Sequence, residues 1–115
     1  GNDGLAAFVA ARLAAFRGRA GLLRERSEKA ARNATGPFDL IFVDGNHNFD
    51  NVVEDVSLWQ PLLRTGGVLA GHDIFNPVCD VHVALRYLQR SAAREKGNRG
   101  GHIHVSADNV FWWYV

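Results

Sequence analysis

The order of hydrophobic and polar positions predicts strands and helices in turn along the chain. Residues 38–43 form a nearly continuous run of apolar, β-favouring residues, which is typical of a central parallel strand. From Phe49 to Leu63, apolar residues keep helical spacing over four turns, and Gly66-Gly67 closes that helix. Residues 68–70 then predict a second short buried strand. This middle part of the chain therefore indicates a strand, a helix and a further strand.

The flanking segments carry shorter patterns. Asp3 and Asp80 each precede a helical pattern and are suitable caps. We expect a surface helix lying on a sheet at 4–16, a short strand at 22–24, a brief helix ending at 33, a helix over 81–88, a mobile loop at 94–101, a strand at 103–105 and a terminal strand within 109–115 that is buried on both faces.

Alternation of strand and helix requires crossover connections, so the predicted fold class is α/β. Ligands of such sheets bind beyond the carboxyl ends of the strands. The sequence places unusual polar residues there twice, at Asp44 to His47 and at His72-Asp73. These two loops form the candidate functional site.

Two chemistries suit these loops. Asp44, His72 and Asp73 would offer two carboxylates and an imidazole to a divalent cation, if the two strands are neighbours. His47 would suit a general base, because imidazole titrates near neutral pH. The structural alternative stays open at this point: Asp44 followed by a glycine can simply form a turn, and the histidines can be exposed loop residues.

Composition narrows the classes of partner. The chain has 115 residues, a formal net charge of +1 and no block of one charge, which argues against nucleic acid as a partner. No apolar run is long enough to span a membrane, and the N-terminus lacks the pattern of a signal peptide. The single cysteine, Cys79, is expected to be a buried inert thiol in a cytoplasmic protein. The chain contains no methionine, so Gly1 is expected to be a processed end or an internal cut.

Three stretches carry a family resemblance: the run from Phe38 through Asp44-Gly45-Asn46-His47, the segment Trp59 to Leu69, and the pair His72-Asp73. Together they resemble class I S-adenosylmethionine-dependent methyltransferases, in the group with an Asp-Gly-x-His loop after the fourth strand. The resemblance implies a partial doubly wound, Rossmann-like and mostly parallel sheet that ends in a C-terminal antiparallel hairpin. Residues 22–24, 38–43 and 68–70 would be the third, fourth and fifth strands.

The same resemblance implies a partial domain. The first strand of the family, its Gly-rich cofactor loop and the acidic residue that holds the ribose do not appear in the sequence. Residues 1–115 are thus expected to be the C-terminal part of a methyltransferase domain. Its sheet would then have an uncovered edge, and a missing N-terminal segment or a second copy of the chain would be the expected partner.

Site roles follow from the resemblance residue by residue. Arg26 and Ser27 would lie against the adenine of S-adenosylmethionine, and Asp44 would border its methionine end. Metal-dependent relatives imply a divalent ion, Mg²⁺ or Mn²⁺, on Asp44, His72 and Asp73; relatives without metal imply His47 as the catalytic base.

The implied function is methyl transfer to an oxygen of a small molecule. A non-catalytic truncated or split domain that needs a partner segment is the alternative, and another doubly wound enzyme is a third.

Overall fold

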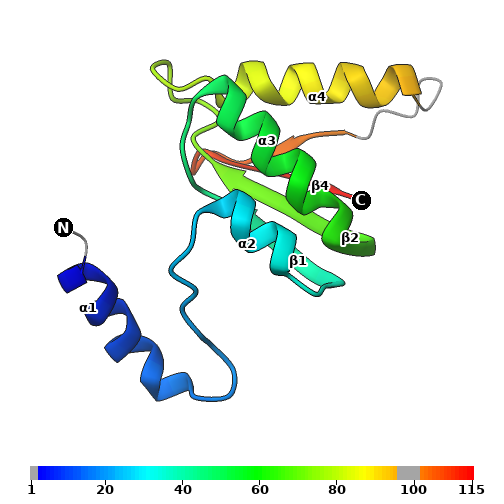
Figure 1. The fold of residues 1–115 in the computed structure, drawn as a ribbon. Helices are drawn as coiled ribbons and strands as arrows, with labels where there is room; N and C mark the ends of the chain where they lie inside the picture. Colours follow the sequence, from blue (N-terminus) through cyan, green and yellow to red (C-terminus); the bar gives the residue numbers. More distant parts are fainter. Residues whose placement is uncertain (1–2, 96–101) are drawn as a thin grey trace.

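The computed structural model describes residues 3–95 and 102–115, and its centre is a four-stranded sheet (Figure 1). β1 and β2 are parallel, whereas β2 with β4 and β4 with β3 are antiparallel. The α/β class and the C-terminal antiparallel hairpin are therefore confirmed, and the described sheet is mixed and only partly parallel. In spatial order the strands are β1 (Phe38–Val43), β2 (Leu63–His72), β4 (Val110–Tyr114) and β3 (His104–Val105).

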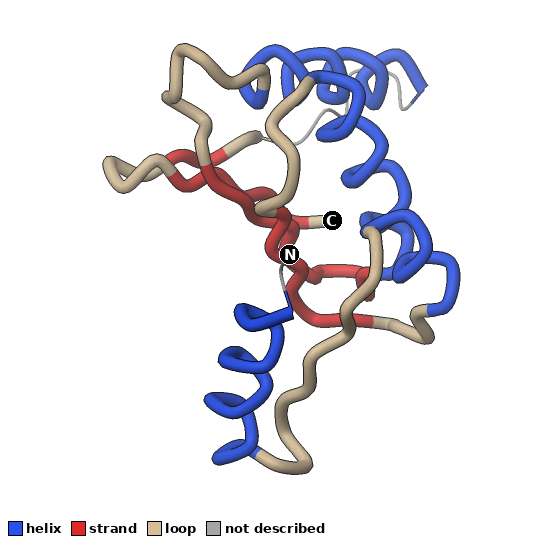
Figure 2. Tube along the Cα trace, turned by 60° about the vertical axis from the view of Figure 1, so that its left-hand side comes forward, coloured by secondary structure: helices blue, strands red, loops and turns tan. Residues whose placement is uncertain are grey.

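Three helices cover one face of this sheet: α2 (Ser27–Asn33), α3 (Phe49–Trp59) and α4 (Val81–Glu95) (Figures 1 and 2). The helix that was predicted to reach residue 63 ends earlier, because a 3₁₀ turn over Gln60–Leu62 contains Pro61 and leads directly into β2. α4 runs to Glu95, so the start of the loop predicted at 94–101 is helical, and its remainder lies outside the described residues. Among the described residues, no helix is long and apolar enough to cross a membrane.

The core lies between these helices and the sheet. α3 contributes Val56, β2 contributes Leu69, α4 contributes Leu85 and β4 contributes Phe111, each almost fully buried. Phe111 also stacks on Trp113 of the same strand, with ring centroids 5.8 Å apart. The terminal strand thus turns Phe111 into the core while Tyr114 is 62% exposed. The expectation of burial on both faces was wrong for β4, because the helices cover only one face.

Gly71 permits the closest approach in this core. A Cβ at this position would lie 2.6 Å from the backbone oxygen of Val43 and within 2.6 Å of the ring of Phe111. We expect Gly71→Ala to lower the free energy of unfolding by about 1–3 kcal/mol, since overpacking forces the neighbours apart. Urea denaturation measures the change, and Gly21→Ala is the control because a Cβ there meets nothing within 4 Å. Equal stability of the two variants would contradict the close packing of Gly71.

Two predictions for the N-terminal part were wrong. Residues 22–24 form no strand, and Leu22 and Leu23 are exposed; a strand needs a hydrogen-bonded neighbour, and none of the described strands pairs with this segment. The helix predicted at 4–16 forms as α1 (Asp3–Leu13) and a 3₁₀ turn to Phe16, but no α1 residue is buried. Figure 1 shows α1 standing apart from the sheet rather than lying on it.

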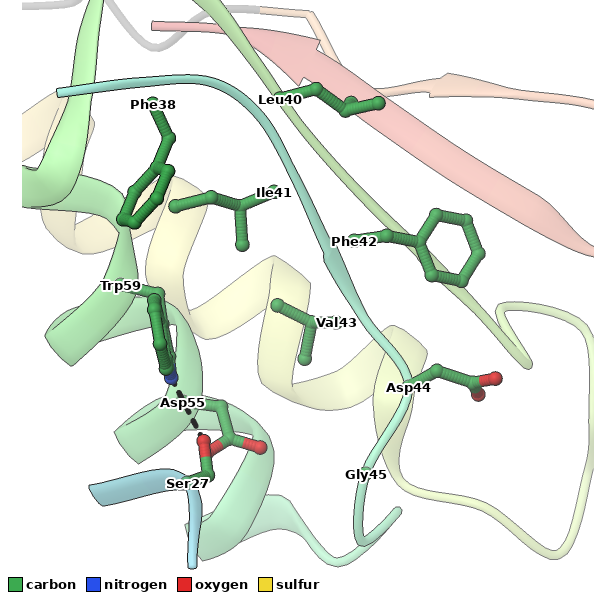
Figure 3. A pocket seen from close by; sticks show the side chains of 10 residues that line it. All are labelled: Ser27, Phe38, Leu40, Ile41, Phe42, Val43, Asp44, Gly45, Asp55 and Trp59. Atoms are coloured by element: carbon green, nitrogen blue, oxygen red, sulfur yellow. Dashed lines mark hydrogen bonds between the residues drawn. The ribbon is translucent and has the colours of Figure 1, made fainter. Parts of the chain in front are cut away.

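β1 lies at an edge of the described sheet, since β2 is the only described strand that pairs with it. Ile41 and Val43 point toward the helices, whereas Leu40 and Phe42 point away from them and are more than half exposed (Figure 3). A strand that was predicted to be central therefore has a free edge and an uncovered face among the described residues.

Candidate functional site

The candidate site lies where β1 and β2 end. The two strands run parallel and Val43 pairs with Gly71, so the residues that follow them leave the sheet at the same edge. Asp44 comes directly after β1, and His72 is the last residue of β2. The cation hypothesis required these two strands to be neighbours. They are, and their pairing brings the two polar loops together.

Three of the predicted side chains form the Asp44 cluster, which we define as Asp44, His72 and Asp73. One potential ligand atom from each residue lies within 4.8 Å of the others. Asp44 is exposed, while His72 and Asp73 are partly buried. The cluster therefore has one side formed by protein and one side open to solvent.

Asp73 holds a central position between the two loops. Its backbone has φ = 71°, in the left-handed region that Asp tolerates better than most residues, and its side chain is 13% exposed. The two carboxylate oxygens have different partners: Oδ1 lies 3.3 Å from Nδ1 of His72, and Oδ2 lies 2.6 Å from Nε2 of His47. One carboxylate therefore links both histidines of the site.

His47 is oriented by this contact. Nε2 of the ring makes the 2.6 Å contact with the Asp73 carboxylate, which leaves Nδ1 as the nitrogen that Asp73 does not contact. The side chain remains 44% exposed and accessible from solvent. An imidazole held by a carboxylate in this way is suited to accept a proton at Nδ1.

Main-chain hydrogen bonds tie the two loops together. The backbone N–H of Asp80 donates to the carbonyl oxygen of His47 at 3.0 Å, and the N–H of Phe49 donates to the Asp80 carboxylate at 3.4 Å. Asp80 directly precedes α4, as predicted, but this carboxylate contact is with the first residue of α3. The position of His47 relative to the second loop is thus set by the backbone.

Cys79 lies in the candidate site, although the sequence analysis predicted only a buried inert thiol. A turn in which the Cys79 N–H donates to Asn76 at 3.1 Å brings it back toward Asp73. Burial raises the pKa of its thiol, and the carboxylates of Asp73 and Asp80 raise it further. His47, Asp73 and Cys79 form the second group whose potential ligand atoms lie within 4.8 Å of one another, which we call the Cys79 cluster. In the sequence, only the turn signal at Asn76-Pro77 indicated that the chain would bring Cys79 back toward Asp73.

A hollow of about 360 Å³ runs along β1 beside the Asp44 cluster (Figure 3). It is lined by Ser27 and Asp44, two of the residues assigned to the cofactor, and by the aromatic rings of Phe38 and Trp59. The Ser27 hydroxyl accepts a hydrogen bond from Nε1 of Trp59 at 2.8 Å. Sequence reasoning missed Asp55, which lines the same hollow one helical turn before Trp59.

Among the three residues predicted to bind the cofactor, Arg26 is the one that does not line this hollow. Its side chain is 86% exposed and forms an ion pair with Glu28 at 2.9 Å. Arg26 immediately precedes Ser27, which lines the hollow and begins α2, but the Arg26 guanidinium faces solvent.

The donor atoms of the Asp44 cluster fit a divalent cation. Two carboxylates and one imidazole supply oxygen and nitrogen ligands, and the exposed side leaves positions for water or a substrate oxygen. The imidazole is better suited to Mn²⁺ than to Mg²⁺, which prefers oxygen ligands.

Comparison with known families identifies the class of protein. The family model described as a methyltransferase domain matches residues 2–74, which is more than half of the chain, and the chain therefore belongs to this family. No curated protein matches the chain.

Solved structures of MycE methyltransferase, from the mycinamycin biosynthetic pathway, share the fold. The complex with Mg and SAH is 24% identical over 75% of this chain, with a TM-score of 0.52. The complex with Mg, SAH and mycinamycin VI is 23% identical over 75% of this chain, with a TM-score of 0.51. The chain spans only 27% of the length of MycE, so the likeness shows a Rossmann-like methyltransferase fold for this portion.

Proposed function

We propose that this chain contributes to methyl transfer from S-adenosylmethionine to an oxygen of a small molecule. The observation that carries the proposal is the meeting of Asp44, His47, His72 and Asp73 at one sheet edge, in a chain of the methyltransferase family. The bound groups of the MycE structures, Mg, SAH and mycinamycin VI, support the same choice of cofactor, cation and substrate class.

His47 is the proposed base. A sulfonium methyl donor already carries a good leaving group, so the protein has mainly to align the acceptor and remove its proton. Nδ1 of His47 accepts that proton, and the Asp73 carboxylate at Nε2 stabilises the imidazolium that results. The 44% exposure of the side chain leaves room for a substrate hydroxyl to approach the ring.

Asp44, His72 and Asp73 are the proposed ligands of a divalent cation. When bound, such a cation would lower the pKa of a substrate hydroxyl. Asp73 serves both groups, because its Oδ1 faces His72 while its Oδ2 faces His47.

The hollow along β1 is proposed to take part of the cofactor. Phe38 and Trp59 offer aromatic surface to the adenine, Ser27 fixes the Trp59 ring, and Asp44 lies toward the methionine end. Arg26 would have to leave Glu28 to reach the adenine. We include in the proposal that 1–115 is a partial domain, and that a further strand beside the free edge of β1 and a Gly-rich loop come from residues outside this sequence.

Chelation tests the cation. In the chain assayed together with the segment proposed to complete it, we expect removal of divalent ions to lower methyl transfer by more than about tenfold, a change of about 1.4 kcal/mol in the barrier. Mn²⁺ should restore the activity. Asp44→Asn should weaken Mn²⁺ binding in calorimetry, since it removes a ligand charge. Asp108→Asn is the matched control, because it removes the same charge from an exposed turn. Unchanged turnover under chelation, together with unchanged Mn²⁺ affinity in Asp44→Asn, would refute the cation site.

The free edge of β1 favours one alternative, a methyltransferase-like segment without activity of its own that pairs with a partner strand. Turnover measured with the partner segment present distinguishes the two. Methyl transfer by the chain together with that segment supports the proposed function, whereas binding of the segment without turnover would assign the chain to a non-catalytic domain.

A further inference from the structure

We propose that the Cys79 cluster is a second cation site, which binds a thiophilic divalent ion such as Zn²⁺ through His47, Asp73 and Cys79. It offers one nitrogen, one oxygen and one sulfur, the three donor types found in protein zinc sites. The Asp44 cluster has no sulfur, and sulfur is the donor that selects zinc-like ions over Mg²⁺.

The distances suit such an ion after small side-chain movements. The ligand atoms of a tetrahedral Zn²⁺ lie about 3.3 to 3.8 Å apart, and the three potential ligand atoms here lie within 4.8 Å of one another. The 2.6 Å contact between His47 and Asp73 would lengthen, because the ion would lie between the two ligand atoms. Coordination also replaces the Cys79 proton, which is released to solvent.

The histidines of the two clusters contact different oxygens of Asp73. Nδ1 of His72 lies 3.3 Å from Oδ1 and Nε2 of His47 lies 2.6 Å from Oδ2, so the histidine of each cluster has its own oxygen. Cys79 is buried, which limits competition from water at the sulfur. The bond from Asp80 N–H to His47 carbonyl holds the loop of His47 beside the loop of Cys79 without any ion.

Occupation of this site has one consequence that rests on the proposed function. Nε2 of His47 would be bound to the ion instead of to Asp73, and a metal-bound ring is a weaker base. A zinc-like ion would then inhibit methyl transfer. The site itself stands independently of that consequence, and it is tested by binding alone.

Cobalt titration of the purified protein is the direct test. Co²⁺ bound to a thiolate gives an intense charge-transfer absorption, and Cys79 is the single cysteine of the sequence, so any such band reports on this residue. We expect the band to saturate at one Co²⁺ per chain and to be absent in Cys79→Ser, whose side chain is close in size. His47→Ala should weaken Co²⁺ binding at least tenfold, while Asp44→Asn should keep the band. Circular dichroism checks that each variant is folded.

The contrary outcomes are distinct. A folded wild-type protein without the band has no thiolate site. A band that keeps its affinity in His47→Ala places the cobalt on Cys79 without His47. Saturation at one Co²⁺ for two chains places the ion between chains. Either result overturns the site. Loss of methyl transfer on chelation with no cobalt band would leave the proposed function standing while this inference fails.

Discussion

Replacing His47 with alanine is expected to lower the rate of methyl transfer by about 10²- to 10⁴-fold, the usual contribution of a positioned general base. The ring lies 2.6 Å from the Asp73 carboxylate, and its side chain is 44% exposed and open to a substrate. Release of S-adenosylhomocysteine measures the effect, in an assay of the chain together with the segment proposed to complete its cofactor site, at saturating cofactor and with a panel of hydroxylated small molecules.

His82→Ala is the matched control, because it removes an exposed histidine from α4 and leaves both clusters intact. We expect it to retain full turnover. If His47→Ala is as active as His82→Ala, His47 is not the base. If chelation abolishes turnover in that case, the cation accounts for the activation of the acceptor.

Phe111→Ala is expected to lower the free energy of unfolding by about 3–5 kcal/mol, the range for removing a buried aromatic ring. Phe111 is 1% exposed, stacks on Trp113 and fills the space over Gly71 that a Cβ would occupy. The cavity cannot collapse easily, because helices on one side and β2 on the other enclose it. Urea denaturation followed by circular dichroism gives the change.

Tyr114→Ala provides the comparison within the same strand. This ring is 62% exposed, so its removal should cost well under half as much as that of Phe111. Similar losses in the two variants would show that the uncovered face of the sheet is buried in solution, and that the described fold lacks an element there.

The elements that sequence reasoning located correctly are those whose signal is local. The bounds of β1 match the apolar run at 38–43, and α3 begins at Phe49 as its spacing predicted. Parallel pairing of the two strands then followed from the connection through α3, and the pairing brought Asp44 beside His72 and Asp73. This much of the site could be predicted because it needed only strand order and the ends of two strands.

The rest depended on contacts between distant segments. Leu22 and Leu23 are apolar but have no pairing partner among the described strands, and none of the apolar residues of α1 is buried. Cys79 joined the site through a turn and a main-chain bond between Asp80 and His47. Backbone hydrogen bonds between loops leave no trace in residue type, so no sequence pattern could have shown them.

The left-handed backbone of Asp73, together with its two engaged oxygens, restricts how this site could change over evolutionary time. Asn would tolerate the backbone but remove the charge, and Glu would keep the charge but lacks the tolerance and carries its oxygens one carbon farther out. No single replacement keeps both properties. His72 and Cys79 each belong to only one cluster. A substitution that changes the bound ion or the methyl acceptor is therefore expected at positions such as His72 and Cys79, and not at Asp73.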